Sequence, residues 1–140
     1  MNPLLQNLKK ELPVVLVPVK VEVSAQKICD QLCAAFEGGS NYWLRAAALI
    51  DSLVPPKKGN IWYGQEKIYT PGFRCELGYD DPEGPGETVK IITWDDLAKG
   101  LQIMAEKYPR HFADVIDETG DAITGDVYIQ CVIFGEIVYG

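Results

Sequence analysis

The residues whose types and spacing best suit chemistry lie in the stretch Glu37-Gly38-Gly39-Ser40-Asn41-Tyr42-Trp43. Two adjacent glycines give backbone freedom, and aromatic side chains with polar atoms follow at once. The aromatic residues that could stack on a base or a nicotinamide ring are Tyr42, Trp43, Trp62 and Tyr63. Asn41 or Arg45 could then read the polar edge of that ring. Because aromatics at strand starts also serve as core or interface residues, the stretch predicts either a ligand platform or a turn that anchors a core.

Two polar residues interrupt the apolar C-terminal segment. Gln130 lies within residues 127–134, and Glu136 lies within residues 134–139. A buried polar group without a partner costs about 1–3 kcal/mol, so each side chain needs either water or a hydrogen-bond partner. Each residue therefore either faces solvent or a neighbouring backbone group, or lines a pocket or a subunit interface.

The sequence has no GxSxG elbow, no GxxxxGKS or GxxxxGKT phosphate loop and no GxGxxG turn. Histidine-based acid–base catalysis would depend on His111 alone, and no carboxylate or nucleophile is tied to it by spacing. We therefore assign no catalytic residue. If the protein were an enzyme acting on a nucleotide or an amide, its acid or base would be Glu37, Asp126 or Glu136.

Candidate metal ligands occur only in weak patterns. Acidic residues gather at 80–81, at 95–96 and at 117–126. Turn preference explains the first group and the helix dipole explains the second, while the third does not match the spacing of an EF-hand calcium loop. The four cysteines contain no CxxC pair: Cys29, Cys33, Cys75 and Cys131. We expect no metal and no cofactor.

Length and charge narrow the class of protein. A chain of 140 residues fits a single globular domain over residues 1–140, in which 1–12 form a frayed or helical arm. The net charge of −7 disfavours direct binding to nucleic acid or to an anionic membrane. No run approaches the ~20 apolar residues of a membrane span, and the N-terminal apolar stretch is interrupted by Pro13 and Pro18. We expect a cytoplasmic protein.

The first half of the chain predicts two strands around a helix. Residues 14–23 alternate apolar and polar as in a strand. Ser24 is placed to cap a helix over 25–37, which Gly38 would end in a left-handed conformation. Residues 42–53 fit either a helix, by alanine propensity, or a strand, by the tight connection and the prolines that follow; we favour the strand.

The second half predicts a hairpin followed by helices. Residues 61–70 read as irregular strand, and 73–79 pair with 87–93 across a Pro/Gly turn. Thr93 caps a helix, and Pro109 starts a short helical turn. The last segment, 124–139, is either a buried helix that Asp126 caps or an apolar strand, and its length favours helix.

These elements together predict an α+β fold: a small antiparallel sheet with helices packed on one face and a helical C-terminal segment. No internal repeat or low-complexity tract suggests further domains.

Two stretches resemble a family of small, uncharacterised proteins encoded by phages, prophages and other bacterial mobile elements. They are Phe36-Glu37-Gly38-Gly39-Ser40-Asn41-Tyr42-Trp43 and the C-terminal segment that runs from Asp121 through Gln130-Cys131-Val132-Ile133-Phe134-Gly135-Glu136-Ile137-Val138-Tyr139-Gly140. Residues 92–101 are similar to the start of the family's central helix, whereas 54–90 have no counterpart. The resemblance implies a phage origin, hence a bacterial host cytoplasm, and a helical last segment.

The sequence-based hypothesis is a non-enzymatic phage binding protein that forms a homo-oligomer and acts in counter-defence. Its ligand would be a nucleotide-type signal or a host protein. The residues expected to bind the ligand or partner are Asn41, Tyr42, Trp43, Arg45, Gln130 and Glu136. The alternatives are a small enzyme acting on a nucleotide or amide and a structural or assembly protein.

Overall fold

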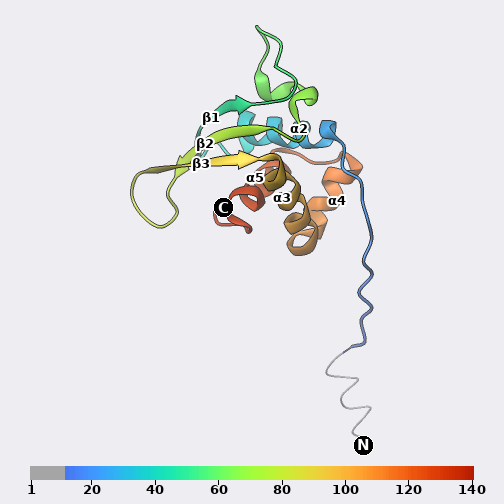
Figure 1. The fold of residues 1–140 in the computed structure, drawn as a ribbon. Helices are drawn as coiled ribbons and strands as arrows, with labels where there is room; N and C mark the ends of the chain where they lie inside the picture. Colours follow the sequence, from blue (N-terminus) through green and yellow to red (C-terminus); the bar gives the residue numbers. More distant parts are fainter. Residues whose placement is uncertain (1–11) are drawn as a thin grey trace, which may run out of the picture.

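The computed structural model describes residues 12–140, and its sheet has three antiparallel strands in the order β1-β2-β3 (Figure 1). The strands are β1 (Leu44–Asp51), β2 (Arg74–Asp80) and β3 (Glu87–Thr93). The predicted hairpin is confirmed, and the ambiguous segment 42–53 is a strand. The arm expected over 1–12 lies outside the described residues except for Leu12.

Burial alternates along the central strand. Cys75, Leu77 and Tyr79 are buried, whereas Arg74 and Glu76 are exposed. Since successive side chains of a strand point to opposite faces, one face of the sheet meets the core and the other meets solvent.

The helices all lie on the side of the sheet that its buried face points to, as Figure 1 shows. They are α2 (Ala25–Ala34), α3 (Trp94–Lys107), α4 (Pro109–Asp117) and α5 (Ala122–Phe134). The predicted α+β class is therefore confirmed, including the helical C-terminal segment.

Helix α5 is the centre of this arrangement, because every residue from Thr124 to Ile133 is buried. Gly125 makes the crossing with α2 possible: a Cβ at this position would lie 2.8 Å from both the Gln31 carbonyl oxygen and the Ala35 nitrogen. A helix that is apolar on all sides belongs in the interior, and α5 has that composition.

The two ends of α5 differ from the sequence-based prediction. Asp121, not Asp126, caps its N-terminus, with its side chain accepting from the Ile123 and Thr124 amides. The helix ends at Phe134 because Gly135 adopts a left-handed conformation with φ 73°, so residues 136–140 fold back instead of continuing the helix.

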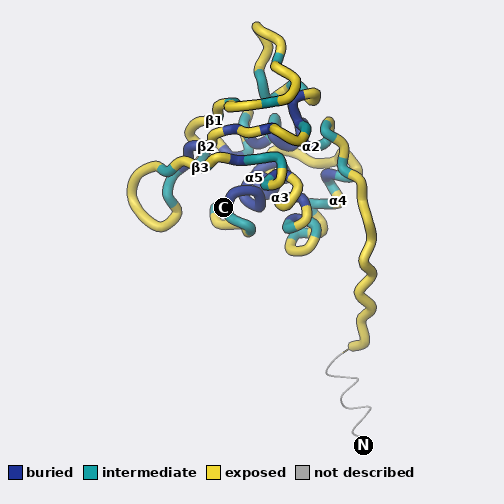
Figure 2. The backbone as a smooth tube through the Cα atoms, viewed as in Figure 1, coloured by how far each residue is buried: buried dark blue, intermediate teal, exposed yellow. Residues whose placement is uncertain are grey.

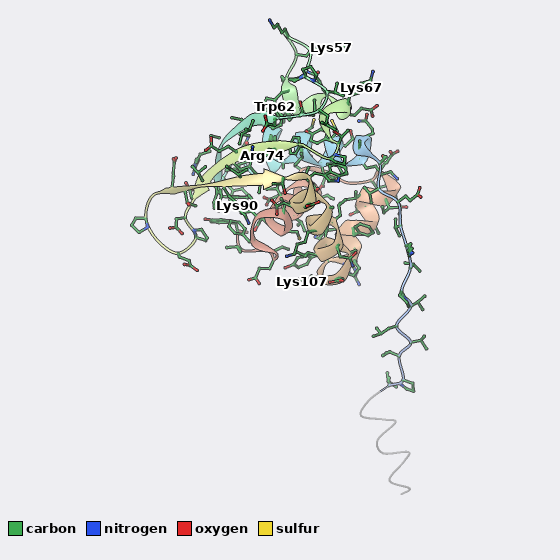
Figure 3. The ribbon with its side chains drawn as sticks, viewed as in Figure 1. Lys57, Trp62, Lys67, Arg74, Lys90 and Lys107 are labelled. Carbon is green, nitrogen blue, oxygen red and sulfur yellow. The ribbon has the colours of Figure 1, made fainter. Side chains whose placement is uncertain are left out.

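Two lysines converge on the C-terminal end of α5 (Figure 3). Lys90 Nζ donates to the Ile133 carbonyl at 2.9 Å, and Lys107 Nζ donates to the Gly135 carbonyl at 2.9 Å. Cations at this end complement the helix dipole, so β3 and α3 both stabilise the helix on which the site is built.

Three further predictions are wrong. Residues 14–23 are not a strand, because no segment of the described chain runs beside them to complete a ladder (Figure 1). Residues 61–70 form two 3₁₀ turns, Trp62–Gly64 and Glu66–Ile68. The helix predicted over 25–37 is present, as α2 followed by the π-helical turn Ala35–Gly39, but Gly38 does not form the expected left-handed cap, because its φ of 179° is extended.

Other expectations hold. Ser24 and Thr93 cap α2 and α3, and Thr93 forms a reciprocal capping box with Asp96. None of the helices in residues 12–140 combines the length and the apolar composition needed to cross a bilayer.

Candidate functional site

A buried carboxylate joins the Gly-Gly corner to helix α5. Asp126 Oδ1 accepts hydrogen bonds from Ser40 Oγ at 2.8 Å and from Trp43 Nε1 at 2.7 Å. Its Oδ2 accepts from the Tyr42 hydroxyl at 2.6 Å and from Gln130 Nε2 at 3.1 Å. We call these five residues the Asp126 cluster. A carboxylate has about four acceptor positions, so every position of Asp126 is filled from within the chain.

The backbone of the corner explains how these donors reach Asp126. A Cβ on Gly39 would lie 2.0 Å from the Ala122 carbonyl oxygen, so only glycine lets the corner approach the first turn of α5. Ser40 follows at once, and its carbonyl accepts from the Trp43 and Leu44 amides. This turn directs both the serine and the tryptophan side chains at the same carboxylate.

Gln130 connects the cluster to the C-terminal tail, residues 136–140. Its Oε1 accepts from the Val138 and Tyr139 amides, each at 2.7 Å, and its Nε2 also donates to the Tyr139 carbonyl at 3.1 Å. The buried amide is therefore fully paired, and its partners fold the tail back across α5.

Aromatic rings close the cluster on one side. Trp43 is fully buried and stacks on Tyr139, with ring centroids 5.2 Å apart and planes 10° from parallel. The Tyr139 hydroxyl donates to the Asp80 carbonyl at 2.6 Å, which ties the tail to the end of β2. Trp43 thus serves as a core residue whose indole nitrogen already has a partner.

A cavity of about 580 Å³ lies beside the Asp126 cluster, between the corner, α5 and the tail. The side chains that define its walls are Tyr42, His111, Ile123, Gln130, Ile137 and Tyr139. Tyr42 is 51% exposed, so its ring forms an accessible wall while its hydroxyl stays bonded to Asp126. Mostly apolar lining with a few fixed polar atoms is typical of small-molecule sites.

The protonation state of Tyr42 follows from its surroundings. Burial of the hydroxyl, together with its hydrogen bond to Asp126 and the charge of that carboxylate, raises the pKa of Tyr42 to about 12. At neutral pH the phenol therefore keeps its proton and donates it to Asp126. The Gln130 amide also lies against the phenol oxygen and acts to lower this pKa. A phenol oxygen has two lone pairs, so one is left to accept a hydrogen bond from a ligand.

The other residues expected at the site lie elsewhere. Asn41 and Arg45 line a separate hollow beside Phe36. Arg45 forms a two-point ion pair with Asp80, at 2.7 and 2.9 Å. Glu136 is exposed beyond the end of α5. The structure therefore gathers Tyr42, Trp43 and Gln130, and it separates them from Asn41, Arg45 and Glu136.

The four aromatics proposed as one stacking surface form two groups. Trp62 and Tyr63 pack with Phe36, at centroid distances of 6.1 and 5.1 Å. Figure 3 places Trp62 toward the loop that carries Lys57 and Lys67, at the end of the domain away from Lys107, which bonds to Gly135 just before the tail. A single flat ligand cannot touch all four rings.

Sequence reasoning missed three participants: Ser40, Asp126 as an acceptor, and Tyr139. One sequence pattern could have shown that Asp126 accepts hydrogen bonds in the core. Asp126 precedes Gln130 by four residues, so both side chains lie on one face of a helix. Two buried polar groups on one face of an apolar helix require a shared set of partners.

The carboxylates considered for catalysis do not converge. Glu37 and Glu136 are exposed, and only Asp126 lines the cavity. Within residues 12–140, no group of three His, Cys, Asp or Glu side chains is arranged to hold a metal ion. The four cysteines are free, and burial raises the pKa of Cys75 to about 12.

Comparison with known proteins gave no relatives for this chain: no family model, no curated protein and no solved structure matches it.

Proposed function

We propose that this chain is a non-enzymatic binding protein that holds a small, flat ligand of the nucleobase or nucleoside type in the cavity beside the Asp126 cluster. The observation that carries this proposal is the way the cavity is built. Its Tyr42 and Tyr139 walls are fixed from behind by hydrogen bonds to Asp126, Gln130 and Asp80. Walls held in advance lose little conformational entropy when a ligand enters.

The lining favours the base portion of a nucleotide. Tyr42 offers a ring and an acceptor oxygen, and His111 offers a ring nitrogen at the rim. None of the described residues that line the cavity is Lys or Arg, so nothing there neutralises a phosphate. A nucleotide would therefore insert its base and leave its phosphates in solvent.

The same contacts bear on whether the carboxylate in the cavity could act as an acid or a base. The carboxylate in the cavity already accepts four hydrogen bonds from the chain, so it has no free position for a substrate proton. This supports binding over catalysis.

The biological context that we propose comes from the resemblance of the corner and the C-terminal segment to phage and prophage proteins. A phage protein that captures a nucleotide-type molecule would work in the cytoplasm of the bacterial host. Removing a defence signal from solution is a role that needs affinity and no turnover.

The proposal is tested by isothermal titration calorimetry of the full chain with nucleobases, nucleosides and their monophosphates. We expect saturable binding of at least one base or nucleoside, and little gain from a phosphate. The Ile123→Trp variant, which fills the mouth of the cavity, should weaken binding at least about tenfold, an energy of about 1.4 kcal/mol.

The matched control is Ile61→Trp, because Ile61 is similarly exposed, at 58% against 64% for Ile123, and does not line the cavity. It should bind like the wild type. Equal losses in both variants, or no binding by any of these compounds together with a stable complex with a host protein, would reject the small-ligand proposal.

A further inference from the structure

Residues 12–23 leave the body of the molecule as an extended arm (Figure 1). Figure 2 shows this arm exposed over nearly all of its length. Its apolar side chains are largely exposed: Leu12 77%, Val14 80%, Val15 85%, Leu16 89%, Val17 70% and Val19 73%. Large apolar side chains gathered in solvent are typical of a surface that a partner covers.

The arm has the pattern of a strand that pairs along one edge. Its odd-numbered residues from 15 to 23 are all valine, so one face of a strand would be uniformly β-branched. In a strand, the N–H and C=O of one residue point to the same edge, and those of the next residue point to the other. Pro18 lacks an N–H, so the edge that it faces cannot form a full ladder. From Val15 to Val23, beyond Pro13, the arm can pair through its odd-numbered residues, as an outermost strand.

The sheet offers a matching edge at β3. β3 is last in the strand order, and no backbone hydrogen bond joins its residues 88–92 to anything but β2 within the described chain. Val89 and Ile91 on this strand are 57% and 45% exposed. Cross-strand pairs of β-branched residues stabilise a sheet. β3 suits the arm better than β1, because the exposed face of β1 carries two alanines, Ala46 and Ala48, and only one β-branched residue, Ile50.

We propose that the arm of one copy of this chain adds to β3 of a second copy as a fourth strand, with the exchange made in both directions. The base of the arm, at Val19, Val21 and Val23, lines one hollow with Trp94, the residue that follows β3. The arm therefore leaves the domain close to its own β3, and the strand that it would join is β3 of the second copy. From there it runs away from its own sheet, so its own β3 is out of reach without a reversal of the chain (Figure 1).

A second copy is the partner that these features favour. One chain supplies both an unpaired strand and an unpaired sheet edge. In a two-fold symmetric dimer, the arm of each copy therefore pairs with the β3 edge of the other copy. Residues 14–23 span roughly 33 Å when extended, which exceeds the roughly 23 Å of the seven-residue β3. The proposal is independent of the ligand in the cavity.

The test is the mass of the full chain in solution, by light scattering after size exclusion across a dilution series, with two proline variants. Val17→Pro removes an N–H that the ladder requires, whereas Leu16→Pro removes one that would face solvent. Both positions are exposed in the arm, so neither change disturbs the folded domain. We expect a wild-type dimer, a dimer for Leu16→Pro, and at least about tenfold weaker association for Val17→Pro.

Hydrogen exchange locates the contact. Amides of residues 88–92 should exchange more slowly in the wild type than in Val17→Pro, and residues 44–51 should not differ. A monomeric wild type, equal weakening by both proline variants, or protection at β1 instead of β3 would overturn the proposal.

Discussion

The Asp126 cluster and the N-terminal arm distribute polar and apolar groups in opposite ways. The cluster places a carboxylate, a hydroxyl and an amide in the core, and each finds its partners within the chain. The arm places Val14, Val15 and Val17 in solvent, and no strand of the described chain pairs with it. Polar groups inside a protein persist when they are paired, whereas a contiguous row of apolar side chains in solvent is typical of a surface that a partner covers.

This difference separates two kinds of unusual residue. Tyr42, Trp43 and Gln130 are unusual in sequence, and the fold explains most of their atoms. What the fold leaves over at the cluster is one ring face and one acceptor oxygen of Tyr42. What it leaves over at the arm is an entire strand. The ring face and acceptor oxygen of Tyr42 suit a small ligand, whereas an unpaired strand suits a macromolecule.

The largest effect should come from removing the acceptor of the cluster. Asp126→Ala leaves two buried donors, Ser40 Oγ and Trp43 Nε1, without a partner. Each unsatisfied buried group costs about 1–3 kcal/mol, so we expect a loss of roughly 2–6 kcal/mol in the free energy of unfolding by urea. The control Asp95→Ala removes an exposed acid from the first turn of α3 and should cost about 0.5 kcal/mol. Similar losses for both would show that the cluster contributes little.

The two glycines of the corner offer a matched pair. Gly39→Ala places a methyl group against the Ala122 carbonyl, whereas a Cβ on Gly38 meets nothing within 4 Å. Overpacking against backbone costs roughly 1–3 kcal/mol, so Gly39→Ala should destabilise by about that amount and Gly38→Ala by less than about 0.5 kcal/mol. The comparison uses thermal and urea unfolding of both variants. Loss of stability in Gly38→Ala alone would contradict the close approach seen at Gly39.

The elements with a strong local sequence pattern could be predicted from the sequence. The β2–β3 hairpin has clean alternation with a Pro/Gly turn, and Thr93 followed by Asp96 gives α3 its capping box. The arm shows where this reasoning ends. Its valine pattern is that of a strand, but pairing depends on a partner that local sequence does not specify.

Only part of the candidate site could be predicted from the sequence. Polar residues in an apolar helix and aromatics after two glycines were singled out correctly as unusual. Which of them meet depends on a contact between residues 86 positions apart, Ser40 and Asp126. It also depends on Gly39, whose close approach to Ala122 no sequence period reveals. Asn41 and Arg45 looked equivalent to Tyr42 in sequence because the direction of each side chain at the corner is set by tertiary packing.

A medium effect is expected from releasing the tail. Gln130→Leu keeps the volume but removes the acceptor of the Val138 and Tyr139 amides, so the tail should detach from α5. Hydrogen exchange at these two amides should become at least about tenfold faster, with a stability loss of roughly 1–3 kcal/mol. Gln102→Leu is the control, since Gln102 is exposed and bonds only to Glu106 in the described chain. Unchanged exchange at the tail would contradict the role of Gln130.

The smallest effect should depend on pH. The pKa of Tyr42 is raised to about 12 from an ordinary value of 10.0, so the folded protein holds this proton more tightly than the unfolded chain. Its contribution is complete below pH 10 and is lost as the pH rises toward 12. Tyr42→Phe should therefore cost about 1 kcal/mol near neutral pH, and the difference from wild type should shrink in this alkaline range. Comparing the two proteins removes the effects of the other buried tyrosines. A difference that is constant with pH would contradict the hydrogen bond to Asp126.

The most direct test of the central claim is a two-dimensional NMR titration of the full chain with the four common nucleosides. The claim predicts saturable shifts confined to the corner, the first turns of α5 and the tail, including the Trp43 indole N–H and the Val138 and Tyr139 amides. These shifts should disappear in Ile123→Trp and persist in Ile61→Trp. Saturable shifts centred on another surface, or spectra that do not change with any nucleoside, would contradict it.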